Sequence, residues 1–295
     1  MQSLAVSALV LLLQNPHEEI RAQALEGLSE QARHGAAISA DWIEGALRDA
    51  SPAVRAAALD ALVEIDCDPE RLDFPALLFD EDPSVRIAAA IAIADLGNKA
   101  AMPDLRRLLS DADEIVRLQA AISLAAFKDA AGVDELIAGL ALSPRESIEA
   151  ARAVGHLGEA APNDAIAALK QISSKRFIAP ELKAQAAAAL YCCTGQRDGE
   201  SIIEKFLSSR NPDTRLTMLS ILARVPAGAI ASMVGRLLED RDPLVASCAI
   251  ETLGALATSN RSGAIAALKA GQHHLRGPLL TELHECLAEL ERDPR

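Results

Sequence analysis

Aromatic residues are scarce in this sequence: one Trp, one Tyr and five Phe make up 2% of its 295 residues. Alternating runs of Val, Ile, Thr and aromatic residues, which are typical of β-strands, are also hard to find. Half of the residues are nevertheless hydrophobic, and alanine and leucine, both strong helix formers, dominate them. The composition therefore predicts an all-α protein.

Positive charge is also in short supply. The chain has 29 Lys and Arg against 42 Asp and Glu, which gives a formal net charge of −13. A nucleic-acid-binding protein needs a stripe of Lys and Arg, and the only compact basic stretch is the short segment Ser174–Phe177. We therefore expect no nucleic-acid partner.

The cysteines do not form a disulfide framework, because their number is odd and their spacing irregular. They are Cys67, Cys192, Cys193, Cys248 and Cys286. The N-terminal run "SLAVSALVLLL" lacks a preceding basic region and is far shorter than the roughly 20 residues that span a bilayer. We read this run as the first core helix and expect a cytoplasmic protein with no membrane partner.

A short motif recurs along the chain: Asp, Asn or Ser, then Pro-x-Val-Arg, then an alanine-rich run. Clear copies are "SPAVRAAALDAL", "DPSVRIAAAIAI", "NPDTRLTMLSIL" and "DPLVASCAIETL". Successive copies lie 30 to 36 residues apart. The residues at the Arg position, here called the Arg slot, are Arg21, Arg55, Arg86, Arg117, Ser147, Lys183, Arg215, Ala246 and Thr281. A near-constant period of this length is typical of a solenoid of repeated helix pairs.

Most copies carry local signals for the start of a helix. The first residue can cap the helix, and the proline after it tolerates the first helical position. The caps expected on this basis are Ser51, Asp82, Ser143, Asn211 and Asp242. The residues three and seven positions after the Arg slot share one helix face and predict the core, where seven of nine copies keep Ala at the first of these positions.

Amphipathic partner helices lie between these motif helices, for example "SADWIEGALRD" and "GESIIEKFLSS". No Gly/Ser-rich or Pro-rich linker divides the chain. We therefore predict one solenoid over residues 1–295, with the most regular repeats in 38–130 and more degenerate repeats in 131–295.

The motif Asp-x-(Asp/Ser)-Pro-x-Val-Arg-x-x-Ala-Ala resembles the HEAT repeat, in the short HEAT-like form named after the phycobilisome lyases. The resemblance is sharpest from Asp49 to Phe127. It implies an armadillo-like α-solenoid, an α–α superhelix of about nine helix pairs, whose second helices line a concave, partner-binding face. Because many functions share this fold, the resemblance specifies architecture better than activity.

The resemblance also implies a structural ladder of charges between repeats. The matching pairs here are Asp49 with Arg55, Asp80 with Arg86, and Asp111 with Arg117. Asp240 is retained where the Arg slot holds Ala246, so the ladder is expected to fail there.

The motif helices have unusually apolar outward positions. With the core at offsets −1, +3, +4 and +7 from the Arg slot, offsets +1, +5 and +8 point the other way. The partner-binding residues predicted from these positions are Ile87, Ile91, Leu118, Ile122, Ile148, Arg152, Tyr191 and Leu216. An exposed apolar strip usually marks an interaction site. The alternative is that a small helix tilt buries these side chains between repeats.

Two groups of residues have the types needed for chemistry. The cluster His273, His274, His284 and Cys286 has zinc-binding residue types, but its spacing fits no common metal motif. Cys192 and His156 occupy the same offset, +9, in adjacent repeats and form the one plausible catalytic pair. We expect no metal, no cofactor and no catalytic residues.

The sequence therefore favours a non-catalytic scaffold or assembly and maturation factor that holds another protein, through an amphipathic helix or an extended peptide. The alternative, suggested by the family resemblance, is a subunit of a bilin (tetrapyrrole) lyase or isomerase, with Tyr191, Arg152 and His156 as the groups to test. A HEAT-like DNA-repair enzyme needs a cationic groove, which the charge balance opposes.

Overall fold

The computed structural model describes residues 4–195, 198–225 and 230–292. Within these ranges the chain forms α-helices, short 3₁₀ helices and turns, and no strand. The all-α prediction is confirmed. The contacts between residues divide the chain into two compact units, Met1–Glu135 (unit 1) and Leu136–Arg295 (unit 2).

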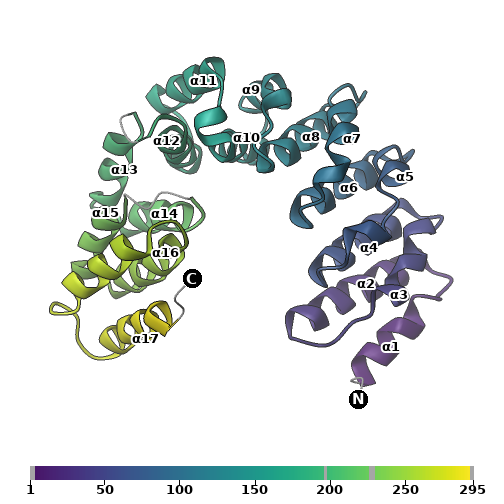
Figure 1. Cartoon of the computed structure of the whole chain (residues 1–295), viewed down its shortest axis with the longest axis horizontal. Helices are drawn as coiled ribbons and strands as arrows, with labels where there is room; N and C mark the ends of the chain where they lie inside the picture. The colour runs from purple at the N-terminus through teal and green to yellow at the C-terminus, as the bar shows by residue number, and fades with distance from the viewer. Residues whose placement is uncertain (1–3, 196–197, 226–229, 293–295) are drawn as a thin grey trace. The chain divides into compact units, whose positions relative to one another are not determined.

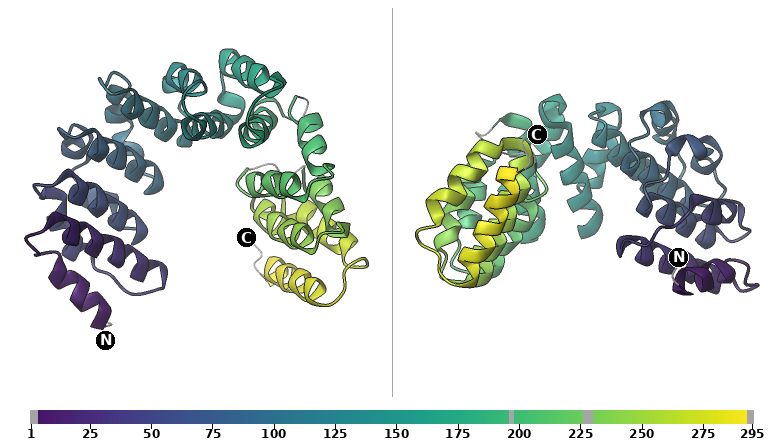
Figure 2. Two further views of the ribbon diagram at one scale, coloured as in Figure 1. Left: turned by 180° about the vertical axis from the view of Figure 1, so that it is seen from behind. Right: turned by 60° about the horizontal axis from the view of Figure 1, so that its bottom comes forward.

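Unit 1 consists of helix pairs in which each second helix contacts the second helix of the next pair. The first helices are α1 (Leu4–Leu12), α3 (Ala40–Ile43), α5 (Phe74–Leu78) and α7 (Met102–Leu108). The second helices are α2 (Glu18–Arg33), α4 (Pro52–Glu64), α6 (Pro83–Asp95) and α8 (Glu114–Ala126). In Figure 1 the helices α2, α4, α6 and α8 follow one another in order, and the reverse view in Figure 2 shows the same arrangement.

Unit 2 repeats the pattern after helix α9 (Val133–Gly139), in which the boundary between the units falls. The first helices are α11 (Asn163–Ser174), α13 (Glu200–Leu207) and α15 (Ala231–Gly235). The second helices are α10 (Pro144–Leu157), α12 (Pro180–Thr194), α14 (Pro212–Leu222) and the first part of α16 (Pro243–Gly271). Asn260 has non-helical dihedral angles inside α16, so residues 261–271 form a separate helical segment that pairs with α17 (Pro278–Arg292).

Counted along the described chain, with α9 as the first helix before α10, these elements make nine successive helix pairs, as the repeat period predicts. The continuity of one solenoid across both units stays a prediction. None of the described helices is both long and apolar enough to cross a bilayer.

The helix caps agree in part with the sequence. Asp82, Asn211 and Asp242 each accept a backbone N–H bond of 2.9–3.0 Å from the residue two positions later. Ser51 and Ser143 form no such bond, so these two predictions are wrong. Ser143 instead donates its hydroxyl to the carboxylate of Glu146 within the first turn.

The core follows the predicted column in eight of the nine repeats. Residues at +3, +4 and +7 from the Arg slot are buried from the Arg21 copy through the Ala246 copy. In the last repeat the predicted core residue His284 is exposed, whereas Leu283 and Leu287 are buried. The register of α17 is therefore shifted by one residue, because its degenerate motif offers no Arg to align.

The charge ladder exists, but its pairing is shifted by one repeat from the prediction. Arg55 donates two hydrogen bonds to Asp80, of 2.9 and 2.6 Å, and Arg86 pairs with Asp111. In the same way Arg21 pairs with Asp49, at 2.6 Å between its Nη2 and the carboxylate. Because the Asp precedes its own motif, its side chain faces the arginine of the repeat before it.

Each ladder arginine also binds its own repeat. Arg55 Nη1 donates to the carbonyl oxygens of Asp49 and Ala50, at 2.9 and 3.2 Å, so Asp49 and Arg55 meet through the backbone. The hydrogen bonds from Arg21 lower the pKa of the Asp49 carboxylate most, and the bond that it accepts from the backbone N–H of Ser51 lowers it further. The ladder thus ties consecutive repeats and fixes the turn between the helices of each pair.

The ladder continues where the sequence predicts its failure. Asp240 pairs with Arg215 of the preceding repeat at 2.7 Å, so the replacement of the next Arg slot by Ala246 does not affect it. The ladder changes instead at Arg117, whose partner is Glu135 at 3.2 Å.

Candidate functional site

The predicted partner-binding strip lies on the faces of the second helices but is not an open surface. In unit 1, Leu118 is buried, whereas Ile87, Ile91 and Ile122 are half-buried. The expected outward exposure of Leu118 is therefore wrong. In this unit α4 and α6 each pack against second helices on both sides, whereas α8, which carries Leu118 and Ile122, packs against α6 and against its own first helix α7. The binding role of these residues stays a prediction.

Unit 2 shows the same effect. Tyr191 is 6% exposed and belongs to the core of this unit, so its predicted outward position is also wrong. Ile148, Arg152 and Leu216 are half-buried. Leu216 packs against the same core, whereas Ile148 and Arg152 line a pocket.

This pocket, called here the unit 2 pocket, is formed by three consecutive second helices, α10, α12 and α14, and the turn that follows α14. Its volume is about 210 Å³. Its apolar wall is formed by Ile148, Gly155, Ala189, Ile221 and Val225. Gly155 lets α10 and α12 approach closely, because a Cβ at this position would lie 3.1 Å from Ala189 Cα.

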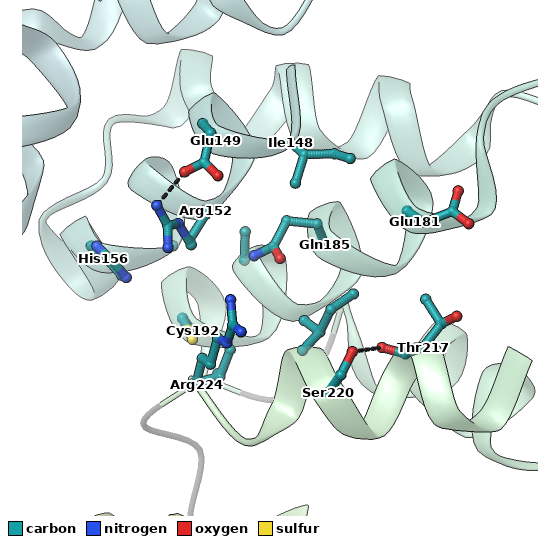
Figure 3. Close-up of a pocket in the computed structure, with 14 residues that line it drawn as sticks. Ile148, Glu149, Arg152, His156, Glu181, Gln185, Cys192, Thr217, Ser220 and Arg224 are labelled. Atoms are coloured by element: carbon teal, nitrogen blue, oxygen red, sulfur yellow. Dashed lines mark hydrogen bonds and ion pairs between the residues drawn. The ribbon is translucent and has the colours of Figure 1, made fainter. Parts of the chain in front are cut away.

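The polar residues of the pocket are unevenly distributed, as Figure 3 shows. Arg152, His156, Cys192 and Arg224 lie together at one end, called here the cationic end. Glu181 and Thr217 lie at the opposite end, and Gln185 lies between the two.

The two arginines of the cationic end differ in their partners. Arg152 forms an ion pair with Glu149, one turn earlier on α10. Arg224 is exposed, and its guanidinium group forms no ion pair or hydrogen bond with any residue that the structure describes. Arg224 is therefore a cation available to a bound group.

Gln185 is the most enclosed polar group of the pocket. The residue is 7% exposed, its side chain lines the pocket, and it forms no hydrogen bond with a described residue. Its amide atoms are not among the fully buried polar atoms without a partner, so they are accessible from the pocket and can pair with a bound group.

The Cys192–His156 pair is brought to one pocket but not into a catalytic arrangement. No hydrogen bond joins the two side chains within the described part of the chain. Burial raises the pKa of Cys192 to about 11, so the thiol is protonated at neutral pH. His156 remains exposed at the pocket edge, and partial desolvation together with the charge of Arg152 lowers its pKa. Within the described structure, Cys192 is therefore a weak nucleophile.

The raised pKa of Cys192 predicts slow alkylation. At pH 8 a thiol of pKa about 11 carries about a hundredfold less thiolate than one at the ordinary value of 9.0. We therefore expect Cys192 to react with iodoacetamide about a hundredfold more slowly in the native chain than in the urea-unfolded chain, as measured by peptide mass spectrometry. Equal rates would contradict the burial of this thiol.

The other candidate groups do not form a site. No group of three or more His, Cys, Asp or Glu in the described ranges can hold a metal ion, and this includes the C-terminal His/Cys cluster. The five cysteines are all free.

Unit 1 has a more open depression with acidic walls. It is lined by Ile91 and small residues of α4, and by the carboxylates of Glu26, Asp60, Glu64 and Asp95. Burial, and then the charges of Glu64, Asp95 and Glu26, raise the pKa of Asp60. Arg33 also lines it, so the depression is acidic but not purely anionic.

The sequence pattern missed several pocket residues. Gln185 and Thr217 lie at offset +2 from the Arg slot, and Arg224 lies at offset +9. At 3.6 residues per turn these offsets point as far from the core as +1 and +8 do. The offsets +2 and +9 therefore also mark positions that can line a pocket, as Gln185 and Arg224 do.

Comparisons with known proteins bear on the family. A model of HEAT repeats matches residues 6–74 and 74–153, half of the chain. The complex of CpcE and CpcF of phycocyanin lyase from Nostoc sp. PCC7120 contains a chain 21% identical in sequence, with a TM-score of 0.47, and the match covers 98% of this chain and 96% of that chain. Human deoxyhypusine hydroxylase in complex with glycerol is 20% identical, with a TM-score of 0.35 and the same two coverages.

A search of curated proteins found no match. The repeat match rests on the first half of the chain, and the helix pairs of both units follow the same pattern. The chain belongs to the HEAT-repeat proteins.

Proposed function

We propose that this protein is a binding scaffold, or an assembly and maturation factor, that holds a segment of another protein on its second-helix faces. The observation that carries the proposal is the unit 2 pocket, whose apolar wall is built by three consecutive second helices. Apolar hollows with a few convergent polar groups are the usual sites of ligand and peptide binding.

The chemistry of the pocket supports binding over catalysis. Its thiol has a raised pKa, and its His lies outside hydrogen-bond contact with that thiol. Its charged groups are two arginines and two carboxylates, which can orient a bound segment by ion pairing. The free cysteines are consistent with a cytoplasmic setting, which we also propose.

A substitution in the pocket wall tests this function. We expect Ile148→Asp to abolish the capture of partner proteins from a lysate of the native host, because the substitution places a charge in the apolar contact surface. The measurement is affinity capture with quantitative mass spectrometry, beside circular dichroism at 222 nm to verify folding.

Ile202→Asp is the matched control. Ile202 is half-buried like Ile148 and packs on the core of unit 2, but it lies on the first helix α13 and lines a different hollow. The control is expected to capture the same proteins as the wild type. Unchanged capture by a folded Ile148→Asp variant would contradict a partner site in the pocket.

We propose that Ile87, Ile91 and Ile122 of unit 1 contribute contacts of the same kind. Ile91 lines the unit 1 depression, and all three remain partly accessible. Their replacement by Asp in the same assay separates the contribution of unit 1 from that of the pocket.

The tetrapyrrole-enzyme alternative has weaker support. Of its three candidate groups, Arg152 and His156 line the pocket, but Tyr191 is buried. A volume of about 210 Å³ is also below the roughly 300–1,000 Å³ typical of sites for drug-sized ligands. The absorption spectrum of an added bilin distinguishes this alternative, because a bound tetrapyrrole changes its spectrum.

A further inference from the structure

The side chain of Gln185 offers hydrogen-bonding groups to a ligand at the pocket wall. Its side chain is enclosed by α10, α12 and α14, yet its carbonyl oxygen and NH₂ group have no partner among the described residues. The amide oxygen and nitrogen of Gln185 are not among the fully buried, unpaired polar atoms of the described residues, so both are accessible from the pocket. A ligand that offers both a donor and an acceptor can therefore pair with them. A peptide bond has both.

The cationic end identifies the charge of the ligand. Arg224 has no anionic partner in the described chain, and Arg152 shares its charge with only one carboxylate, Glu149. Two guanidinium groups at one end of a pocket stand out in a chain with a net charge of −13. Guanidinium groups bind carboxylates through paired, charge-assisted hydrogen bonds.

The size of the pocket limits the ligand to about one residue. Its volume of about 210 Å³ is smaller than a typical small-molecule site. Within this space the pocket offers an apolar wall, an amide partner and two cations. An apolar residue at the C-terminus of a chain has an apolar side chain, a peptide bond and a carboxylate within one residue. An internal Asp or Glu has the carboxylate in its side chain, so the apolar group must come from a neighbouring residue.

We infer that the unit 2 pocket binds the C-terminal residue of a partner protein. The apolar side chain of that residue packs on Ile148 and Ile221, its α-carboxylate faces Arg224 and Arg152, and the preceding peptide bond pairs with the amide of Gln185. The inference rests on the proposed function and specifies which part of the partner enters the pocket.

The test uses N-acetyl-L-leucine, which has the carboxylate, the amide and an apolar side chain, and N-acetyl-L-leucinamide, which lacks the charge. The readout is the Gln185 side-chain amide signal in ¹H–¹⁵N NMR of the full chain, assigned by its loss in Gln185→Leu. We expect the acid to bind in the low millimolar range, which is typical of a fragment of this size, and the amide to bind at least about fivefold more weakly.

Two variants test the cation. Arg224→Gln is expected to weaken the binding of N-acetyl-L-leucine at least about fivefold, because a charge-assisted hydrogen bond is lost. The matched control Arg210→Gln, which removes an exposed arginine outside the pocket, is expected to have no effect. Equal binding of the acid and the amide, or an equal effect of both substitutions, would overturn the inference.

Gln185→Leu tests whether the amide has a purely structural role. Since the wild-type side chain makes no hydrogen bond within the described chain, the variant is expected to keep or raise the Tm. It is also expected to lose the binding of N-acetyl-L-leucine. A lowered Tm would show that Gln185 has structural bonds and would contradict its assignment as a ligand contact.

A longer peptide tests whether the pocket's ligand is the C-terminus of a protein or a free small acid. Acetyl-Ala-Ala-Ala-Leu with a free carboxylate is expected to bind at least as tightly as N-acetyl-L-leucine, and weaker binding would overturn the partner assignment. Loss of protein capture by Ile148→Asp without binding of any acid would contradict this inference alone. Acid binding with capture unaffected by Ile148→Asp would contradict the proposed function.

Discussion

Replacing Arg55 with alanine is expected to lower the free energy of unfolding by about 3–5 kcal/mol. Arg55 is 8% exposed, and it joins two repeats through Asp80 while it binds the carbonyl groups of Asp49 and Ala50. Its removal leaves the Asp80 carboxylate, whose side chain is 13% exposed, without its cation. Breaking a buried ion pair on one side costs far more than losing an exposed one. Urea unfolding followed by circular dichroism measures the change.

Arg33→Ala is the control for this prediction in the same unit. Arg33 pairs with Glu30 at 3.0 Å, and both side chains are more than half exposed, so the expected loss is at most about 1 kcal/mol. Similar losses for Arg33→Ala and Arg55→Ala would contradict a structural role for the ladder.

Replacing Gly199 with alanine is expected to destabilise unit 2 by about 3 kcal/mol, near the upper end of the usual cost of overpacking. Gly199 precedes α13 where this helix meets α12. A Cβ there would lie 2.2 Å from the carbonyl oxygen of Ala187 and 2.8 Å from the backbone N of Tyr191. Because backbone atoms cause both clashes, rotation of a side chain cannot relieve them. Thermal and urea unfolding measure the loss.

Gly45→Ala controls for the substitution itself. No atom lies within 4 Å of a Cβ at this position, so the variant is expected to keep its stability or gain up to about 1 kcal/mol from reduced chain entropy in the unfolded state. A Gly199→Ala variant as stable as the wild type would show that α12 and α13 do not approach this closely.

The architecture was predictable because each repeat carries several agreeing signals. The proline start, the Arg slot and the alanine column all indicate the same helix, and the buried residues Ala58, Ala89 and Ala120 follow that column. Where the motif degenerates, the signals separate. Thr281 gives no anchor for α17, so its core falls one residue away from the aligned position, at Leu283 and Leu287.

Contacts between repeats were less predictable than contacts within them. The sequence places Asp80 and Arg86 six residues apart, but the geometry of the helix pair directs Asp80 toward Arg55, 25 residues earlier. Leu118 is buried as well, on a helix that packs against both α6 and α7, although its offset from the Arg slot predicts an outward position. A period along one chain does not specify which neighbour a side chain meets.

The pocket was only partly predictable. Ile148 and Arg152 were found from the outward offsets, but Gln185 looks like an ordinary polar residue in an alanine-rich helix. Its significance depends on being enclosed without a partner, and only the three-dimensional packing shows that.

Site-specific photo-crosslinking tests most directly whether the second-helix face holds a partner. A photoreactive amino acid is placed at the position of Ile148, in the pocket, or of Ile202, on the first helix α13, and the full chain is irradiated in cells of the native host. If a partner lies on the second-helix face, we expect a crosslinked partner protein from position 148 and none from position 202. Crosslinks from position 202 without any from position 148 would contradict a partner site on this face.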